Sequence, residues 1–567
     1  MSTQFLSFIK NRQKLGYLTK GILICVFLIF FIVCPIVFVF SQSLMNENGA
    51  FTFQNYVNAF SNEDTGKAIW DSLLLAISVT GLSTLIAVPE AYLLAKTRLR
   101  KLWWLDLILI IPFMVPPYIN SMGWMLFMQR NGILWRNLPF LRPLASSFYS
   151  FFGMVWIMSM HTSPFLMTML KSAFLSFPKS LDDANDVYQK SRIKRFFKVY
   201  MPILLPNFFI GAFLVFVKAL SEYGTPATFG PAIGVFTFTT MITDRMQIAP
   251  IDFGSAASLA SLLVFICMLL WMLQMIIIDK KAVNLKNEGE GRYSKSIFLT
   301  TIGSVFLLVL FFFSAFIPLF TIVVSSFKKI LYKNVFEPGN FTWENYQIAF
   351  GDDTGFGTGF EAIGNSFLVG IASSFIVLLL GLFFAFYSHK NKKRVLAKSV
   401  EFLDMLPQMI PNIVTGIGMI MFFNTIYKFF PAYRTVWMLI IGYSVVFLPG
   451  MVSYIKNSLV QMPSSLLEAG RVYSKNEMNV DLKILLPQAL GGAFYGFAMT
   501  LIVALRELVT AKLLQPPAFY TISLFIDSQF EQGNQQAAMA LAVVSVGITL
   551  ALLLPLEYIS TKKKGRA

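Results

Sequence analysis

The chain contains little charge, little histidine and little cysteine, and each scarcity argues against a class of protein. Charged residues make up 13% of its 567 residues, whereas soluble domains average about 25%. The two histidines, His161 and His389, are too far apart in the sequence to indicate a metal site. The three cysteines all fall inside apolar runs, which predicts small core side chains rather than disulfides or metal ligands: Cys25, Cys34 and Cys267.

The chain also lacks the motifs of common hydrolases. It has no G-x-x-x-x-G-K-S/T segment, so no phosphate-binding loop is predicted. No Ser-His-Asp constellation and no closely spaced group of His and Cys stands out. We therefore predict that the chain is not an enzyme, that it hydrolyses no ATP by itself, and that it binds no metal or other cofactor of its own.

What the chain has in abundance is apolar surface. Apolar residues make up 56% of the sequence, 59 residues are Phe, and the mean hydropathy is +0.65. The net charge of +17 is carried in short clusters between long apolar runs. That placement is typical of the cytoplasmic loops of a membrane protein and argues against a nucleic-acid partner.

These runs predict an all-α polytopic membrane protein, because about 20 apolar residues are needed to cross the hydrocarbon. The basic N-terminus and its apolar run of about 20 residues indicate a retained first span, since a signal peptide has a shorter apolar region of roughly 7–15 residues. Twelve spans are predicted, near 21–41, 69–95, 103–127, 149–172, 201–220, 254–278, 297–325, 364–388, 402–424, 433–456, 487–508 and 534–558.

The distribution of Lys and Arg predicts that both termini are cytoplasmic. With that orientation, 33 of the 46 basic residues lie in the inner segments, as the positive-inside rule requires. A cluster in one outer loop runs against it: Arg130, Arg136 and Arg142.

The sequence repeats itself once. FTFQNYVNAF at 51–60 matches FTWENYQIAF at 341–350, and the segment 178–202 matches 463–487 without a gap, from the opening proline to the closing one. Six spans separate the copies, so both have the same orientation and the repeat axis lies along the membrane normal. We predict two pseudo-symmetric six-helix halves, 1–285 and 286–567, with a central pathway between them.

Each copy of the segment, 178–202 or 463–487, predicts a short amphipathic helix in a cytoplasmic loop, with apolar residues at i, i+3, i+6 and i+7. Such a helix can dock into a groove of a soluble partner or lie on the bilayer surface. Duplication at equal spacing favours docking, since membrane anchoring needs no matched copies. The residues concerned are Leu181, Asp183, Ala184, Val187 and Tyr188, then Leu466, Glu468, Ala469, Val472 and Tyr473.

The doubled segment resembles the EAA motif of bacterial ABC importer permeases of the MetI-like type. The second copy has Pro463, Leu466, Glu468 and Ala469 before Leu486-Pro487. It departs from the family at Ser474, where the motif has a Gly that permits a bend. The resemblance implies a multi-pass protein of a bacterial plasma membrane. It also implies two copies of a cytoplasmic ATPase that carries ATP and Mg²⁺, and an external solute-binding protein.

The fused arrangement resembles the ferric iron permease subgroup, which implies ferric iron as the solute. Related permeases for thiamine, polyamines, phosphonates and sugar phosphates leave other substrates open. Glu222 and Glu507 occupy equivalent positions of the repeat and follow the spans after the doubled segments. Both either flank the outer mouth of a pathway, where carboxylates would ligate a hard cation, or cap helices. A secondary transporter or channel is the rival class, but such proteins place ionisable groups inside the membrane. The interiors of the spans here are almost free of charge, and Glu90 is one exception.

Overall fold

A computed structural model describes most of the chain. The described residues are 16–46, 48–61, 63–181, 192–281, 293–294, 296–335, 337–351, 357–392, 394–460, 462–473 and 477–564. Within them the chain is helical, and its few β contacts are isolated bridges rather than strands. The prediction of an all-α polytopic membrane protein is confirmed.

The predicted spans coincide with helices. In the described residues, nine helices are long and apolar enough to cross a membrane, or up to eleven spans if each of two bent helix pairs counts as one. The remaining predicted span, 149–172, coincides with α9, Phe151–Leu175. That helix has 25 residues but is less apolar, because His161, Thr162 and Ser163 interrupt it; all three are buried.

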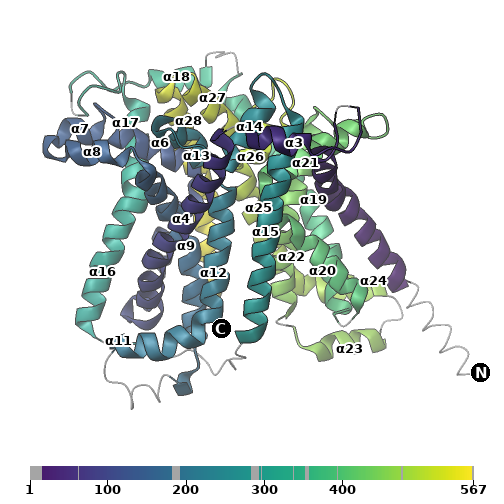
Figure 1. Cartoon of the computed structure of the whole chain (residues 1–567). Coiled ribbons are helices and arrows are strands. Elements are labelled where there is room, and N and C mark those ends of the chain that lie inside the picture. The colour runs from purple at the N-terminus through teal and green to yellow at the C-terminus, as the bar shows by residue number, and fades with distance from the viewer. Residues whose placement is uncertain are drawn as a thin grey trace, which may run out of the picture. The chain divides into compact units, whose positions relative to one another are not determined.

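The chain divides into two compact units. Figure 1 shows their helices, coloured by residue number. Unit 1 comprises Met1–Asn55 and Gly355–Phe525. It contains the span Gly16–Ser43, which ends in α2 (Cys34–Ser43). Its other helices are α19 (Gly359–Lys390), α20 (Val395–Met409), α21 (Asn412–Thr425), α22 (Val436–Val460), α23 (Ser464–Tyr473), α24 (Glu477–Val480), α25 (Leu486–Leu505) and α26 (Val509–Leu514).

Unit 2 comprises Tyr56–Thr354 and Ile526–Ala567. The short helices α3 (Gln54–Ser61) and α27 (Ile522–Glu531) cross the unit boundaries. The helices inside unit 2 are α4 (Glu63–Lys96), α5 (Trp103–Met114), α6 (Pro117–Met128), α7 (Ile133–Asn137), α8 (Arg142–Phe148), α9, α11 (Arg192–Arg195), α12 (Met201–Ser221), α13 (Gly224–Ile233), α14 (Phe238–Gln247), α15 (Phe253–Lys281), α16 (Ile297–Phe311), α17 (Ile317–Phe327), α18 (Glu344–Gly351) and α28 (Gln535–Lys564).

The boundary between the two compact units does not fall at residue 285. The first span of the chain packs within unit 1, among helices of the second sequence half, through α2 against α21. Conversely, the span Ile297–Phe327 packs within unit 2, among helices of the first half, through α17 against α6. The boundary at 285 therefore remains a prediction about duplication in the sequence, whereas the packing exchanges the first span of each half.

Each exchanged span contacts a glycine of a broken helix. A Cβ built on Gly418 would lie 2.6 Å from the carbonyl oxygen of Pro35, within unit 1. A Cβ built on Gly123 would lie 2.8 Å from the carbonyl oxygen of Pro318, within unit 2. Only a residue without a Cβ lets the backbones approach this closely, a common device in membrane helix packing.

The broken helices are the third span of each half. α5 and α6 are bent by 86° at their break, and α20 and α21 by 107°. Prolines cause these breaks, since Pro116 and Pro411 lie between the paired helices, where a ring in place of the backbone N–H prevents a continuous helix.

Elsewhere prolines are accommodated without a break. A five-residue π-helical turn precedes the proline in four spans, at Ile29–Val33, Phe196–Tyr200, Phe312–Phe316 and Asp481–Leu485. The wider turn relieves the clash between the proline ring and the preceding carbonyls. The turns before Pro35 and Pro318 match each other, and so do those before Pro202 and Pro487. Each match joins one turn of the first half to one of the second, so the repeat extends to local helix geometry.

Side chains satisfy the carbonyls at the ends of the exchanged spans. In unit 1, Asn55 Nδ2 donates to the carbonyl oxygens of Gln42 and Met45 at 3.1 and 2.8 Å. In unit 2, Asn345 Nδ2 donates to those of Ser326 and Lys328 at 2.8 and 2.9 Å. The two asparagines occupy matching positions of the repeated FT-x-x-NY motif, so this motif fixes the loop after each exchanged span.

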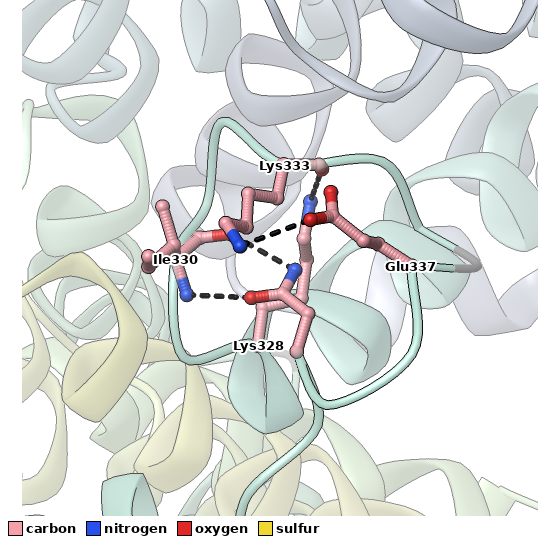
Figure 2. A network of polar contacts seen from close by, with 5 residues as sticks. Lys328, Ile330, Lys333 and Glu337 are labelled. Carbon is pink, nitrogen blue, oxygen red and sulfur yellow. Dashed lines mark hydrogen bonds and ion pairs between the residues drawn. The ribbon is translucent and has the colours of Figure 1, made fainter.

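In unit 2 this loop is also held by lysines (Figure 2). The ammonium group of Lys328 donates to the carbonyl oxygens of Leu331 and Lys333 at 2.5 and 2.6 Å. Burial lowers the pKa of Lys328. Lys333 Nζ lies 2.9 Å from Glu337 Oε1, and this hydrogen bond lowers the pKa of the exposed Glu337 carboxyl.

We predict that Gly418→Ala destabilises the protein. The added Cβ would meet the Pro35 carbonyl at 2.6 Å, so the two backbones must separate. Overpacking of this kind costs about 1–3 kcal/mol. The midpoint of thermal unfolding in detergent should therefore fall. The control is Gly364→Ala in α19, where a Cβ meets no atom within 4 Å. An equal response of the two variants would contradict the prediction.

Candidate functional site

The second copy of the doubled segment forms the helix α23. Ser464–Tyr473 follow Pro463, which lies just before the helix. The predicted apolar stripe is exposed: Leu466 is 41% exposed, Val472 81% and Tyr473 91%. Glu468 and Ala469 are exposed as well. The stripe is therefore an uncovered apolar surface on unit 1.

α23 is held to its own unit at Gly470, next to the exposed stripe. Gly470 is buried, and a Cβ there would lie 2.2 Å from the side chain of Ile484. α23 packs here against α24 and the π-helical turn that follows it. Figure 1 shows α23 as a separate short helix below the labels of α20 and α22. Gly470 has no side chain, which permits this close contact.

The first copy lies mostly outside the described residues. Asp183, Ala184, Val187 and Tyr188 fall in the segment 182–191, of which nothing is described. Leu181 is described and is exposed. The prediction for the first copy thus rests on its sequence match to α23.

Glu222 is placed as a helix cap. It follows α12 directly, and its Oε1 accepts a hydrogen bond of 2.9 Å from the backbone N–H of Thr225, in the first turn of α13. Its own carbonyl oxygen accepts from Thr239 Oγ1 at 2.9 Å. Burial raises the pKa of the Glu222 carboxyl to about 7, although the Thr225 and Gly224 donors lower it.

Glu507 repeats this arrangement in unit 1. Its Oε1 accepts from the backbone N–H of Thr510 at 3.1 Å and from Thr510 Oγ1 at 2.9 Å, at the start of α26. Asn412 Nδ2, from the first residue of α21, donates to the same oxygen at 3.4 Å. The carbonyl oxygen of Glu507 itself accepts from Ser523 Oγ at 2.6 Å. Glu222 and Glu507 therefore both cap the helix that follows them. Their role in a pathway stays a prediction.

The segments that follow the two glutamates are fixed in matching ways. The backbone N–H of Phe238 donates to Ser72 Oγ at 2.8 Å in unit 2, and that of Ile522 donates to Ser366 Oγ at 2.7 Å in unit 1. Residues 224–233 form the helix α13, with Pro226 in its first turn and Pro231 further along. A proline in the first turn of a helix needs no hydrogen-bonded N–H.

Unit 2 holds buried polar atoms near Glu222. A Cβ on Gly224 would lie 3.1 Å from Tyr118 Cβ and 3.2 Å from Glu222 Oε1, so Tyr118 of α6 and Glu222 adjoin the same small space. The buried atoms that have no hydrogen-bond partner among the described residues include Tyr118 Oη, Asn120 Nδ2 and Glu222 Oε2. Buried polar groups without a partner are rare and call for a physical explanation.

The basic residues beside the two glutamates differ in setting. The Lys218 ammonium lies over the rings of Phe113 and Phe165, at 5.8 and 5.0 Å from their centroids. Such a position gives a cation–π attraction. Arg506 precedes Glu507 and interacts with it electrostatically. Within the described ranges, no group of three or more His, Cys, Asp and Glu side chains is arranged to hold a metal ion.

Two ion pairs were missed by the sequence reasoning. Lys171 Nζ on α9 lies 2.5 Å from Asp106 Oδ1 on α5, within unit 2. Lys456 Nζ on α22 lies 2.6 Å from Glu401 Oε1 on α20, within unit 1. A signal existed in the sequence, because Lys171 precedes Pro178 by the same interval at which Lys456 precedes Pro463, in the register of the doubled segment.

A comparison with protein families finds the same family in two separate parts of the chain. The model of the family described as "Binding-protein-dependent transport system inner membrane component" matches residues 87–284 and again residues 377–563. One match falls in each half of the sequence, which agrees with the internal repeat.

Similar proteins of known name are transport permeases. A ferric transport system permease protein of Actinobacillus pleuropneumoniae is 25% identical over 97% of this chain and 79% of its own length. A putative ferric transport system permease protein of Haemophilus influenzae is 25% identical over 90% of this chain and 81% of its own. A spermidine/putrescine permease of the same species, 26% identical, matches only 42% of this chain but 88% of its own length.

The Glu507 cap makes a stability prediction. Glu507→Ala removes the acceptor for the Thr510 N–H, which should lower the free energy of unfolding by about 1–2 kcal/mol. Glu507→Gln keeps an oxygen acceptor at the same place and should cost clearly less. Thermal unfolding of both variants in detergent provides the comparison, and equal losses would show that the cap is not what Glu507 contributes.

Proposed function

Because the chain belongs to the family of binding-protein-dependent transport system inner membrane components, and is the permease of an ABC importer, we propose that it carries ferric iron. The iron would pass from an external binding protein through the membrane into the cytoplasm. The proposal for the substrate is supported by similarity to ferric permeases over nearly the whole chain. It is also supported by the two carboxylates at matching positions, since Fe³⁺ prefers hard oxygen ligands.

The exposed apolar stripe of α23 is the observation that supports coupling of this chain to an ATPase. An uncovered stripe of this kind on a soluble loop suits a groove on a partner protein. We assign that partner as a cytoplasmic ATPase, one copy on α23 and one on the matching segment of the first half. The ATPase supplies ATP and Mg²⁺, while Ala469 allows close approach and Glu468 can pair with an arginine of the partner.

The proposed docking of an ATPase implies an orientation of the chain in the membrane. The doubled segments and both termini would lie in the cytoplasm, in agreement with the concentration of Lys and Arg in those segments. Glu222 and Glu507 follow spans that run outward from the doubled segments, so they would lie toward the binding protein. The membrane is then a bacterial plasma membrane, crossed many times by this chain.

The path role of Glu222 and Glu507 is proposed together with their capping role. Oε1 of each residue is occupied by the helix start, which holds the carboxylate in place. Oε2 of Glu222 is buried without a hydrogen-bond partner among the described residues, and the buried Tyr118 adjoins Gly224 beside this carboxylate. A positioned carboxylate oxygen and a phenolic oxygen are suitable contacts for a passing hard cation.

The alternative substrates differ in the charge that the path would have to bind. A phosphonate or sugar phosphate would need basic groups in the path, and Lys218 and Arg506 are the nearest ones. Lys218 lies against two aromatic rings, which reduces its suitability as an anion ligand. Thiamine and polyamines are cations and remain compatible with the carboxylates, so the transport assay below includes them as competitors.

We predict that Ala469→Arg abolishes uptake. The long charged side chain would stand in the docking stripe, so the ATPase should no longer bind, while membrane insertion is unaffected. Ala469→Ser is the matched control, since it keeps a small side chain and should retain uptake. Co-purification of the ATPase and iron uptake into proteoliposomes measure the two effects. Wild-type uptake by Ala469→Arg would refute the docking role.

We also predict that the double variant Glu222→Gln, Glu507→Gln loses ferric iron uptake. Glutamine retains the acceptor for each helix start but removes the negative charge from the path. Assembly with the ATPase and stimulation of ATP hydrolysis by the binding protein should persist. Undiminished uptake would exclude a path role, and loss of assembly would assign the carboxylates to structure alone. Competition by excess thiamine or spermidine tests the alternative cations.

A further inference from the structure

The two lysine–carboxylate pairs recur in matching positions of the repeat. Lys171 Nζ lies 2.5 Å from both carboxylate oxygens of Asp106, and Lys456 Nζ lies 2.6 Å from Glu401 Oε1. The two lysines are equivalent in the register that aligns Pro178 with Pro463. The pair is formed with an Asp in one half and a Glu in the other, so the ionic contact recurs although the carboxylate side chain differs in length.

Each lysine lies close to a doubled segment. Lys171 is on α9, which ends at Leu175, three residues before Pro178. Lys456 is on α22, which ends at Val460, three residues before Pro463. A displacement of either doubled segment would therefore act first on the helix end that carries the lysine.

Each carboxylate lies on the first arm of a broken helix. Asp106 is in the first turn of α5, and Glu401 is in the second turn of α20. The breaks at Pro116 and Pro411 are each ten residues further along, or about 15 Å at the helical rise. Beyond the breaks lie α6, which adjoins Glu222, and α21, whose Asn412 donates to Glu507.

We propose that Lys171–Asp106 and Lys456–Glu401 are positioning pairs that couple the ATPase to the path. Each pair joins the helix before a coupling segment to the near arm of a broken helix, and the break converts a movement of that arm into a change beside the glutamate. The proposal rests on the proposed function, because it needs an ATPase on the coupling segments.

Stability alone is a weak explanation for the pairs. The side chains are partly exposed, at 16% and 40% for Lys171 and Asp106, and 30% and 34% for Lys456 and Glu401. Ion pairs at such positions contribute little to the free energy of folding. Removing one charge should therefore leave the protein folded, so that a transport defect can be measured separately.

A second carboxyl near each pair decides how to exchange the charges. Asp404 interacts electrostatically with Lys456 and Glu401, so a carboxylate placed at 456 would be repelled. In unit 2 the neighbouring acid is Glu90, which interacts with Asp106. A lysine placed at 106 would be attracted by Glu90. The exchange is therefore made in unit 2, as Asp106→Lys with Lys171→Asp.

The experiment uses the full complex, with its ATPase and binding protein, in proteoliposomes. It measures ferric ions moved per ATP hydrolysed and the stimulation of ATP hydrolysis by the iron-loaded binding protein. Lys171→Met and Lys456→Met should each lower the number of ions per ATP about fivefold, the lower end of measured coupling between sites. The exchanged variant should return to within about twofold of wild type. Lys398→Met, an exposed lysine on α20, is the control and should change nothing.

Three results decide between the outcomes. Unchanged ions per ATP in Lys171→Met and Lys456→Met would overturn the proposal, and so would an exchanged variant as defective as Lys171→Met. If the wild-type complex moves no iron but its ATPase is stimulated by the binding protein, the substrate assignment fails instead. The role of the pairs is then tested by the stimulation of ATP hydrolysis by the binding protein. Lys171→Met should lose this stimulation, and the exchanged variant should regain it.

Discussion

The structure depends on one constraint: a backbone polar group that leaves a helix inside an apolar environment must find another partner. Prolines create such groups in most spans of this chain. In four spans a π-helical turn precedes the proline, whereas at Pro116 and Pro411 the chain breaks into two helices. After two other spans, Glu222 and Glu507 accept a backbone N–H at the start of the next helix, so the residues proposed to line the path also hold these helix starts in place.

Hydropathy was sufficient to place the spans, because crossing hydrocarbon requires long apolar runs whatever lies next to them. It also placed α9, although its buried His161 makes that helix less apolar than the others. The exposure of α23 followed from its periodicity. The caps were predicted only as an alternative, since a glutamate after a helix end is equally compatible with a ligand or a cap.

The neighbours of each span could not be predicted from the sequence. Hydrophobic periodicity marks a buried face but not the helix that covers it, so nothing indicated that Pro35 would meet Gly418. The ion pairs were missed for a related reason, since Lys171 and Asp106 lie in different spans. The repeat could have shown them, because both partners recur as Lys456 and Glu401, but only if charges at span ends had been compared between the halves.

The exchange of first spans has a consequence for the synthesis of the protein. Residues 1–55 belong to the same compact unit as residues 355–525, so the whole of 56–354 is made between the end of one part and the start of the other. At a synthesis rate of about 5–20 residues per second, the first span leaves the ribosome roughly 15–60 s before any of its lasting neighbours exist. During that interval lipid, a chaperone of membrane insertion or a transient contact with a newly made span must cover the face of Pro35 that later meets Gly418. A fused chain keeps the waiting span attached to its eventual neighbours, which two separately made halves would have to find by diffusion.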